Sequence, residues 1–436
     1  MYKNFVQWFR ESSPYIHRFR GKTFVIAFSG KLIEDGHLYN LVQDLALLNS
    51  LGIRLVVVHG ATSQIDKELK KQNIETLSIK GVRVTDDNAM DAVKKIIGSL
   101  RIDIEAAFSL GIANSPMEKA KVRVTSGNFI IARPLGIIEG VDYKFTGLVR
   151  AVDSDVINRH LELGEIVLLS PLGYSVTGEA FNIPHPDIAV HTAIALKSHK
   201  LIFFIDEDGL LDDRGHLIRE LVVEEAESYN ETYSTRLSSE MINKLASSIK
   251  ACKNGVRRTH FVNRTKEGSL LKELFTRDGS GTMVASDSYA NIRQARTEDI
   301  AGILRLIQPM EKKGTLIKRD RKHLEMNISQ FYILERDTTA VACSTLIPYL
   351  KENMAEIGCL AVDPLEQNKG IGEDILLYME KQAKKMGITQ IFVLSTQTFH
   401  WFLEMGYKIS DFDNLPEKKK NEYDVKRNPK VLIKNI

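Results

Sequence analysis

A glycine-containing turn between an apolar strand and an amphipathic helix constrains the C-terminal third of this chain. IGCLAVDP (357–364) is typical of a strand, and QNKGIG (367–372) leads into a helix over 371–386 that ends at Gly387. Such a turn lets backbone N–H groups approach an anion, and the helix dipole adds to the attraction. The GxGxxG and Walker patterns do not fit, because residue 375 is Ile and no GxxxxGK[ST] occurs. The turn therefore predicts a pyrophosphate site of another kind.

Strand and helix patterns divide the chain into two parts. Before residue 262, strands are expected at 23–28, 53–58, 129–132, 166–169 and 201–205. Helical patterns separate these strands, which predicts an α/β fold: an open, mainly parallel sheet with helices on both faces. In the rest of the chain, helices are expected at 297–308, 371–386 and 398–404, and strands at 331–335, 340–347, 355–362, 388–394 and 407–409. This second part reads as an α+β domain.

Four segments follow from these patterns. We expect an amphipathic N-terminal helix over 1–20, a first domain over 21–283, a linker over 284–290 and a second domain over 291–436. The linker is placed where small and polar residues replace the apolar periodicity. The N-terminal helix is expected to pack either on another subunit or on its own domain.

Composition excludes several classes of function. The 59 basic and 56 acidic residues leave a net charge of +3, which does not favour nucleic acid or an anionic membrane as partner. No apolar run is long enough to span a bilayer. Cys252, Cys343 and Cys359 are far apart, which favours reduced thiols and a cytoplasmic location. No HExxH or paired CxxC motif is present, so no metal is expected.

The second domain resembles the Gcn5-related N-acetyltransferases (GNAT). Gln367-x-x-Gly370-x-Gly372 after a strand is similar to the acetyl-CoA loop of that family, and FHWFLEMGY (399–407) is similar to its closing segment. The resemblance implies acetyl-CoA as co-substrate, with the strand end bonding the pantetheine arm and the loop holding the pyrophosphate. The residues so implied are Cys359, Leu360, Ala361, Val362, Gln367, Lys369, Gly370, Ile371 and Gly372.

The whole chain resembles the N-acetylglutamate synthases, which couple an amino-acid-kinase domain to a GNAT domain. The similar stretches include PYIHRFRGKTFVI, SGNFIIARPLG, AEIGCLAVDP, LPEKKK and RNPKVLI. The resemblance implies an amino-acid N-acetyltransferase that acetylates the α-amine of L-glutamate, the first step of arginine biosynthesis, under feedback inhibition by L-arginine. It also implies a homo-oligomer, with a hexamer expected.

Acetyl transfer requires a base, because the substrate amine arrives as an ammonium ion. Glu356 is the candidate, on the strand expected to touch the cofactor and at the position that the resemblance gives the base; an ordinary strand carboxylate is the alternative. Phe402 replaces the tyrosine that many GNAT enzymes use, and the resemblance offers Ser395 instead. A strand-end serine is otherwise a turn residue.

Arginine side chains suit the two substrate carboxylates because a guanidinium binds a carboxylate through two hydrogen bonds. By resemblance, Arg319 and Arg427 are favoured, and surface charges are the alternative. Pro429 stands where related synthases carry Ser, which leaves no hydroxyl there. Lys418 to Lys420 read as a solvated surface run.

The first domain resembles the amino-acid kinases without their reactive lysine. Their KxGG opening corresponds here to Ala27-Phe28-Ser29-Gly30, with Ala27 at the lysine position. Phosphoryl transfer depends on such cations, so no kinase activity is expected. The resemblance implies an arginine site instead, formed by His260, Glu273, Gly279 and Gly281 with Tyr15 from the N-terminal helix.

Two other functions remain open from the sequence. One is an acetylglutamate kinase with an acyltransferase-like module, against which Ala27 argues. The other is a non-catalytic sensor of arginine and acetyl-CoA, against which Glu356 argues.

Overall fold

The structure of this chain is a computed structural model. It describes residues 2–79, 81–111, 115, 117–276, 278–286, 290–336, 339–367, 370–423 and 427–436. The chain divides into two compact units between Asp287 and Ser288, inside the segment expected to be the linker. The expected linker also includes residues 284 and 285, which end the strand Thr282–Ala285, and residue 290, which begins the strand Ala290–Gln294. Each unit is described by itself.

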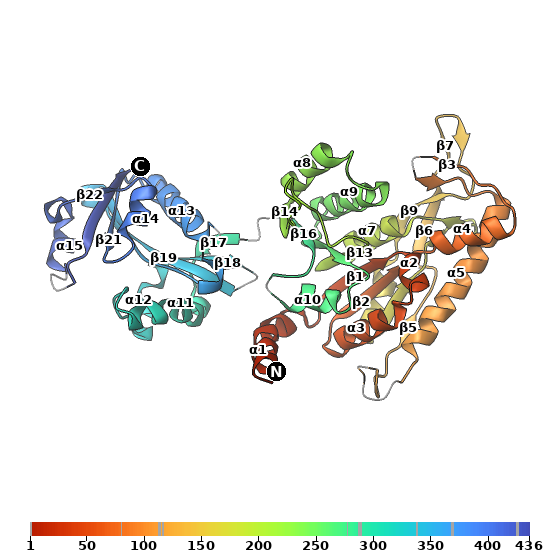
Figure 1. The fold of residues 1–436 in the computed structure, drawn as a ribbon, viewed down its shortest axis with the longest axis horizontal. Helices are drawn as coiled ribbons and strands as arrows, with labels where there is room; N and C mark the ends of the chain where they lie inside the picture. Colours follow the sequence, from red (N-terminus) through yellow and green to blue (C-terminus); the bar gives the residue numbers. More distant parts are fainter. Residues whose placement is uncertain are drawn as a thin grey trace. The chain divides into compact units, whose positions relative to one another are not determined.

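The first unit is an α/β domain (Figure 1). Its helices are α1 (Tyr2–Phe19), α2 (Gly30–Glu34), α3 (Leu38–Ser50), α4 (Thr62–Lys71), α5 (Asp87–Phe108), α6 (Ser154–Glu162), α7 (His185–Ala195), α8 (Val223–Tyr233), α9 (Ser239–Lys253) and α10 (Ser269–Phe275). Its strands are β1 (Thr23–Phe28), β2 (Arg54–His59), β3 (Ser78–Ile79), β4 (Val82–Arg83), β5 (Val124–Thr125), β6 (Ile130–Pro134), β7 (Ile137–Ile138), β8 (Val141–Asp142), β9 (Gly147–Val152), β10 (Ile166–Leu169), β11 (Leu172–Tyr174), β12 (Ala180–Asn182), β13 (Lys200–Ile205), β14 (Glu220–Val222), β15 (Arg258–Asn263) and β16 (Thr282–Ala285).

The main sheet has the strand order β14-β16-β15-β13-β1-β2-β10-β5. All neighbours in it are parallel except β15 and β16, which confirms the predicted open, mainly parallel sheet. The strand expected at 129–132 is present as β6, but it does not belong to the main sheet: β6 lies in a smaller sheet of order β12-β11-β6-β9 and runs antiparallel to β9. An apolar strand pattern gives no information about which sheet a strand joins.

Side chains of the main sheet alternate between two cores. Val25 and Val56 pack with α6 to α9, whereas the next residues, Ile26 and Val57, pack with α3, α5 and α10. Parallel strands buried on both faces read as continuous apolar runs, which is why these strands could be found in the sequence.

The N-terminal helix packs part of its length on its own domain. Phe19 is buried in the core beside α3 and α10, and the Ser12 hydroxyl donates a hydrogen bond to the carbonyl of Phe275 at 3.0 Å. Nearer the N-terminus, Val6 and Phe9 are exposed.

The second unit is an α+β domain built on one sheet of order β17-β18-β19-β20-β21-β23-β22. Its strands are β17 (Ala290–Gln294), β18 (Phe331–Arg336), β19 (Thr339–Tyr349), β20 (Met354–Val362), β21 (Gln390–Ser395), β22 (Lys408–Ser410) and β23 (Lys430–Asn435). Its helices are α11 (Ile300–Lys312), α12 (Arg321–Asn327), α13 (Ile371–Lys385), α14 (Phe399–Glu404) and α15 (Glu417–Asn421). Helices α13 and α14 cover one face, and α11 and α12 cover the other (Figure 1).

Candidate functional site

Two neighbouring strands of the second unit diverge at the site. β20 and β21 are parallel, and their pairing ends at Glu356 and Phe392 although β20 continues to Val362 and β21 to Ser395. β20 stays paired with β19 over the same stretch. A cavity of about 600 Å³ lies at the divergence.

A β-bulge shapes the wall of this cavity. On β19 and β20, Thr345 pairs with Gly358 and Cys343 pairs with Ala361, so Ser344 alone lies opposite Cys359 and Leu360. Cys359 has a φ of 51°, a left-handed conformation that residues other than glycine rarely adopt. A bulge interrupts the ladder and leaves a residue of the bulged strand unpaired. At this point of the cavity wall, the backbone N–H and C=O groups of β20 are therefore not all used in regular strand pairing.

Most of the predicted cofactor residues line this cavity. They are Cys359, Leu360, Val362, Gln367, Gly370, Ile371 and Gly372. The side chain of Ala361 is instead buried in the core beneath α11. Lys369 lies outside the described residues. The residues predicted from the sequence thus lie at the end of β20 and at the start of α13, and both segments line this cavity.

The turn before α13 has the conformation that its glycines permit. Gly370 is the N-cap residue with a φ of 78° and, as a glycine, offers no side chain to cap the helix. A side chain on Gly372 would begin 3.4 Å from the Trp401 indole. The first N–H groups of α13, at the edge of the cavity, therefore have no acceptor on the side chain of their N-cap residue and are suited to an anion.

Glu356 lies on the cavity wall, nearly buried, and has two partners on one oxygen. Lys419 Nζ is 2.7 Å from its Oε2, and the Tyr349 hydroxyl donates to the same oxygen at 3.4 Å. Burial and the negative charge of Glu356 raise the pKa of Tyr349, so the phenol keeps its proton. The surface-run interpretation is wrong for Lys419, whose side chain is only 15% exposed and lines the cavity.

Ser395 is a turn residue that also lies on the cavity wall. Its hydroxyl oxygen accepts a hydrogen bond from the Thr398 amide at 3.1 Å, as a turn residue does, and lies 3.2 Å from the Thr398 hydroxyl. It also lines the cavity, as does Phe402.

The two predicted substrate arginines line the same cavity and contact one short segment. Arg319 Nη1 donates to the carbonyl of Ile317 at 3.1 Å. Arg427 Nη2 donates to the carbonyls of Gly314 and Thr315 at 3.1 and 3.0 Å. Pro429 lies at the same wall. Residues more than a hundred positions apart therefore meet at one end of the cavity.

The predicted arginine contacts of the first unit form a second cluster. His260 Nδ1 is 2.7 Å from Glu273 Oε1, and the amides of Ser280 and Gly281 donate to Glu273 Oε2 at 2.6 and 2.9 Å. Gly281 has no room for a side chain, because an added Cβ would stand 1.8 Å from the carbonyl oxygen of Phe261. A Cβ on Gly279 would stand 2.5 Å from Glu273 Oε2.

Lys200, which the sequence did not single out, extends this cluster. Its ammonium lies 2.8 Å from His260 Nε2 and 5.3 Å from the centre of the Phe19 ring on α1. Burial and the Lys200 charge lower the pKa of His260 to about 4, so the neutral ring accepts from Lys200 and donates to Glu273. Burial opposes charge on Glu273, but its hydrogen bonds outweigh this and lower its pKa to about 2. The same α1 carries Tyr15, whose ring lies 6.0 Å from that of Phe19.

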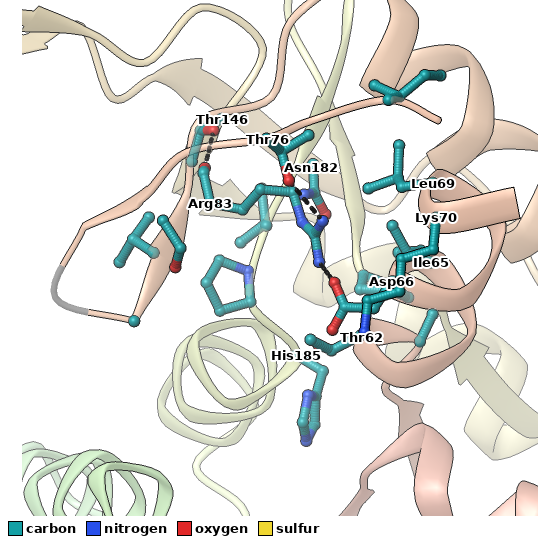
Figure 2. Close-up of a pocket in the computed structure, with 18 of the residues that line it drawn as sticks. Thr62, Ile65, Asp66, Leu69, Lys70, Thr76, Arg83, Thr146, Asn182 and His185 are labelled. Carbon is teal, nitrogen blue, oxygen red and sulfur yellow. Dashed lines mark hydrogen bonds and ion pairs between the residues drawn. The ribbon is translucent and has the colours of Figure 1, made fainter. Parts of the chain in front are cut away.

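A further cavity of about 630 Å³ lies at the ends of β2 and α7, and none of the predicted arginine contacts lines it. Figure 2 shows Arg83 and Asp66 facing each other there, joined by an ion pair. Arg83 Nη1 also donates to Thr76 Oγ1 at 3.2 Å. The guanidinium in this cavity is therefore already bound by the protein.

The position of the kinase lysine is part of the apolar core. Ala27 is buried in the cluster beneath α7. The nearby Lys31 lies 3.6 Å from Asp206 and is half exposed.

The described residues hold neither a metal centre nor a membrane-spanning helix. Among them, no group of three or more His, Cys, Asp or Glu side chains could hold a metal ion. None of the helices in these parts of the chain is long and apolar enough to cross a membrane. All three cysteines are buried and form no disulfide.

Comparisons with known proteins agree with the two-unit structure. Residues 22–263 match the amino acid kinase family, and residues 300–407 match the acetyltransferase (GNAT) family. The amino-acid acetyltransferase of Ralstonia nicotianae is 44% identical over 434 residues, which cover 100% of this chain and 96% of that protein. The amino-acid acetyltransferase of Escherichia coli (strain K12) is 44% identical and covers 99% of this chain and 98% of its own length.

Solved structures extend the similarity to three dimensions. The N-acetylglutamate synthase of Neisseria gonorrhoeae, complexed with coenzyme A and L-arginine, has a TM-score of 0.91 and 37% identity over 99% of both chains. Its complex with coenzyme A and N-acetyl-glutamate has a TM-score of 0.64 at the same identity and coverage. This chain belongs to the amino-acid acetyltransferase family, with an amino-acid-kinase domain followed by a GNAT domain.

Proposed function

We propose that this chain transfers the acetyl group of acetyl-CoA to the α-amine of L-glutamate, the first step of arginine biosynthesis. The observation that carries the proposal is one cavity lined by the acetyl-CoA turn, Glu356 and two arginines. The N. gonorrhoeae synthase, similar over its whole length, binds coenzyme A and N-acetyl-glutamate. The first predicted domain, residues 21–283, regulates, and the second, residues 291–436, catalyses.

In this mechanism the cofactor lies in the gap between β20 and β21. The N–H groups at the start of α13 hold its pyrophosphate, and the bulged backbone near Leu360 supplies an N–H to the oxyanion of the tetrahedral intermediate. Glu356 takes a proton from the substrate ammonium, so that the neutral amine attacks the thioester carbonyl. The thiolate of coenzyme A leaves readily because thiols have a pKa of about 8.5. The Ser395 hydroxyl, which lines the same cavity, donates a hydrogen bond to this thiolate, which then takes its proton from water.

Arg319 and Arg427 bind the substrate carboxylates. Each guanidinium already contacts backbone carbonyls of residues 314–317, which fixes its position before substrate arrives. A preorganised guanidinium loses little freedom when it forms a paired hydrogen bond with a carboxylate. Glutamate, with two carboxylates, suits a site with two such groups.

L-Arginine binds at the cluster of Glu273, His260, Gly279 and Gly281, with Tyr15 from α1, and inhibits transfer. Glu273 accepts hydrogen bonds from His260 and two amides, and a carboxylate has about four acceptor positions, so Oε1 retains capacity for a guanidinium. The N. gonorrhoeae synthase, which binds L-arginine, supports this regulation. By linkage, glutamate must weaken arginine binding as much as arginine weakens glutamate binding.

The chain assembles as a homo-oligomer, expected to be a hexamer, in which the exposed part of α1 contacts another subunit. Val6 and Phe9 are 43% and 53% exposed and suit an apolar interface. Sedimentation velocity tests the assembly: a Val6→Glu/Phe9→Glu variant is expected to sediment as a smaller species. An unchanged sedimentation coefficient would exclude α1 as the contact.

A thiol-release assay with acetyl-CoA, a panel of amino acids, and ATP tests the proposed function. We expect thiol release that depends on L-glutamate and that falls on titration with L-arginine. Release without glutamate, or none at all, would contradict acetyl transfer. Phosphorylation of acetylglutamate by ATP would instead indicate a kinase. Activity that is indifferent to L-arginine would remove the regulatory role alone.

A further inference from the structure

We propose that Lys419 is a positioning residue of the acetyl-transfer reaction, whose ammonium holds the Glu356 carboxylate in a fixed orientation. The inference rests on the proposed function, in which Glu356 is the base. Lys419 Nζ lies 2.7 Å from Glu356 Oε2, and both side chains are largely shielded from water, with 15% and 9% exposure. An ion pair this shielded is screened little by solvent.

The contacts of Glu356 distinguish its two oxygens. Lys419 and Tyr349 both engage Oε2. Within the described parts of the chain, no hydrogen bond or ion pair reaches Oε1. Oε1 lies 3.7 Å from where a Cβ would stand on Gly358, a residue that also lines the cavity. Lys419 thereby directs Oε1 toward the space in which the substrate amine must lie.

Other charged and titratable groups near Glu356 do not replace Lys419. Tyr349 reaches it from β19, and Glu422 and Tyr423, just after α15, line the same cavity. Arg319 and Arg427, the other predicted cations of this wall, contact backbone carbonyls. Without Lys419, Glu356 would keep no ion-pair partner among the described residues, and the Tyr349 hydroxyl alone would orient it. A general base must lie within hydrogen-bond reach of the proton that it takes, so a carboxylate that is free to rotate is a poorer base.

The fold places Lys419 and leaves its neighbours outside the site. α15 begins just after Leu415, which is buried in a cluster with Tyr349 and Phe392. Packing beside the base therefore anchors the start of this helix. On the same helix, Lys420 pairs with Glu417 at 2.8 Å and does not line the cavity. Lys420 is a matched control for charge and helix position.

The test compares kcat and KM for L-glutamate in Lys419→Met, Lys419→Arg and Lys420→Met. In Lys419→Met, kcat is expected to fall about tenfold or more while KM stays within about twofold of wild type, because a base that is not held in place is lost from the transition state rather than from substrate binding. Lys419→Arg restores part of kcat, and Lys420→Met leaves kcat unchanged. The Kd for coenzyme A, measured by calorimetry, stays within about twofold of wild type in all three variants, a change of under 0.5 kcal/mol.

Several outcomes overturn the inference without touching the proposed function. One is a kcat of Lys419→Met equal to that of wild type while Glu356→Gln is impaired. Another is a kcat of Lys419→Arg no closer to wild type than that of Lys419→Met. If Lys419→Met fails to fold by circular dichroism, Lys419→Gln is measured in its place under the same criteria. Absence of glutamate-dependent thiol release from the wild-type protein would instead remove the proposed function itself.

Discussion

At the scale of single residues, Glu356 carries the chemistry. It lies at the last paired position of β20 and β21, where the cavity begins. Glu356→Gln keeps the shape and removes the base, so turnover is expected to fall more than about tenfold, within the usual range for general-base catalysis. Thiol release at saturating substrates measures this. Coenzyme A binding should persist, and the exposed Glu352→Gln serves as control. An unchanged rate in Glu356→Gln would assign the base to another group.

A second residue, Gly281, is fixed by space rather than by chemistry. A Cβ there would overlap the Phe261 carbonyl at 1.8 Å, so Gly281→Ala must displace backbone. We expect a loss of about 1–3 kcal/mol in the free energy of unfolding, as for other overpacked sites. Gly98→Ala in α5, with open space around it, should instead gain up to about 1 kcal/mol. Urea denaturation compares the two variants, and equal stabilities would refute the steric argument.

At the scale of elements, the start of α13 decides cofactor binding. Gly372→Val adds a branched side chain 3.4 Å from the Trp401 ring, at the edge of the cavity. The added bulk should keep a pyrophosphate from the helix N–H groups, and we expect the Kd for coenzyme A to rise more than about tenfold. Calorimetry measures it, with the half-exposed Leu377→Val of the same helix as control. Equal affinities would place the pyrophosphate elsewhere.

At the scale of the whole molecule, the first unit should be sensitive to acid. Burial lowers the pKa of His59 and His260 to about 4 and of His185 and His199 to about 3. Each takes up a proton near pH 6.5 when unfolded but not when folded, so the stability present above pH 6.5 is lost as the pH falls toward 4. Asp44, whose pKa burial raises to about 7, acts in the opposite direction and offsets part of the loss.

Scanning calorimetry at pH 7.5, 6.0 and 5.0 tests this balance. The transition that acetyl-CoA raises identifies the second unit, because a ligand stabilises the folded state that binds it. The transition of the first unit should fall on acidification. A constant or rising Tm for the first unit over this range would contradict the inferred charge state of its histidines.

Much of this protein could be predicted from its sequence. The buried strands β1, β2, β10 and β13 read as apolar runs because both of their faces are covered. The turn before α13 could be predicted from its two glycines between a strand and a helix. Other elements left a weaker signal. The C-terminal strand β23 lies between β21 and β22 in the sheet of the second unit. Its short stretch KVLIKN was nevertheless not predicted as a strand.

The sequence by itself determined the division into two parts and the residue types around the site, because these depend on local periodicity and on chemically distinctive side chains. The choice of Glu356 as the candidate base also needed the family resemblance. Only the tertiary structure decided which lysine of Lys418 to Lys420 faces Glu356, that Lys200 joins His260, and that Ala361 faces the core. The physical reason is that such contacts join segments 60 or more residues apart or depend on a bulge. Neither the pairing register nor the direction of a side chain on a short helix is encoded in local composition.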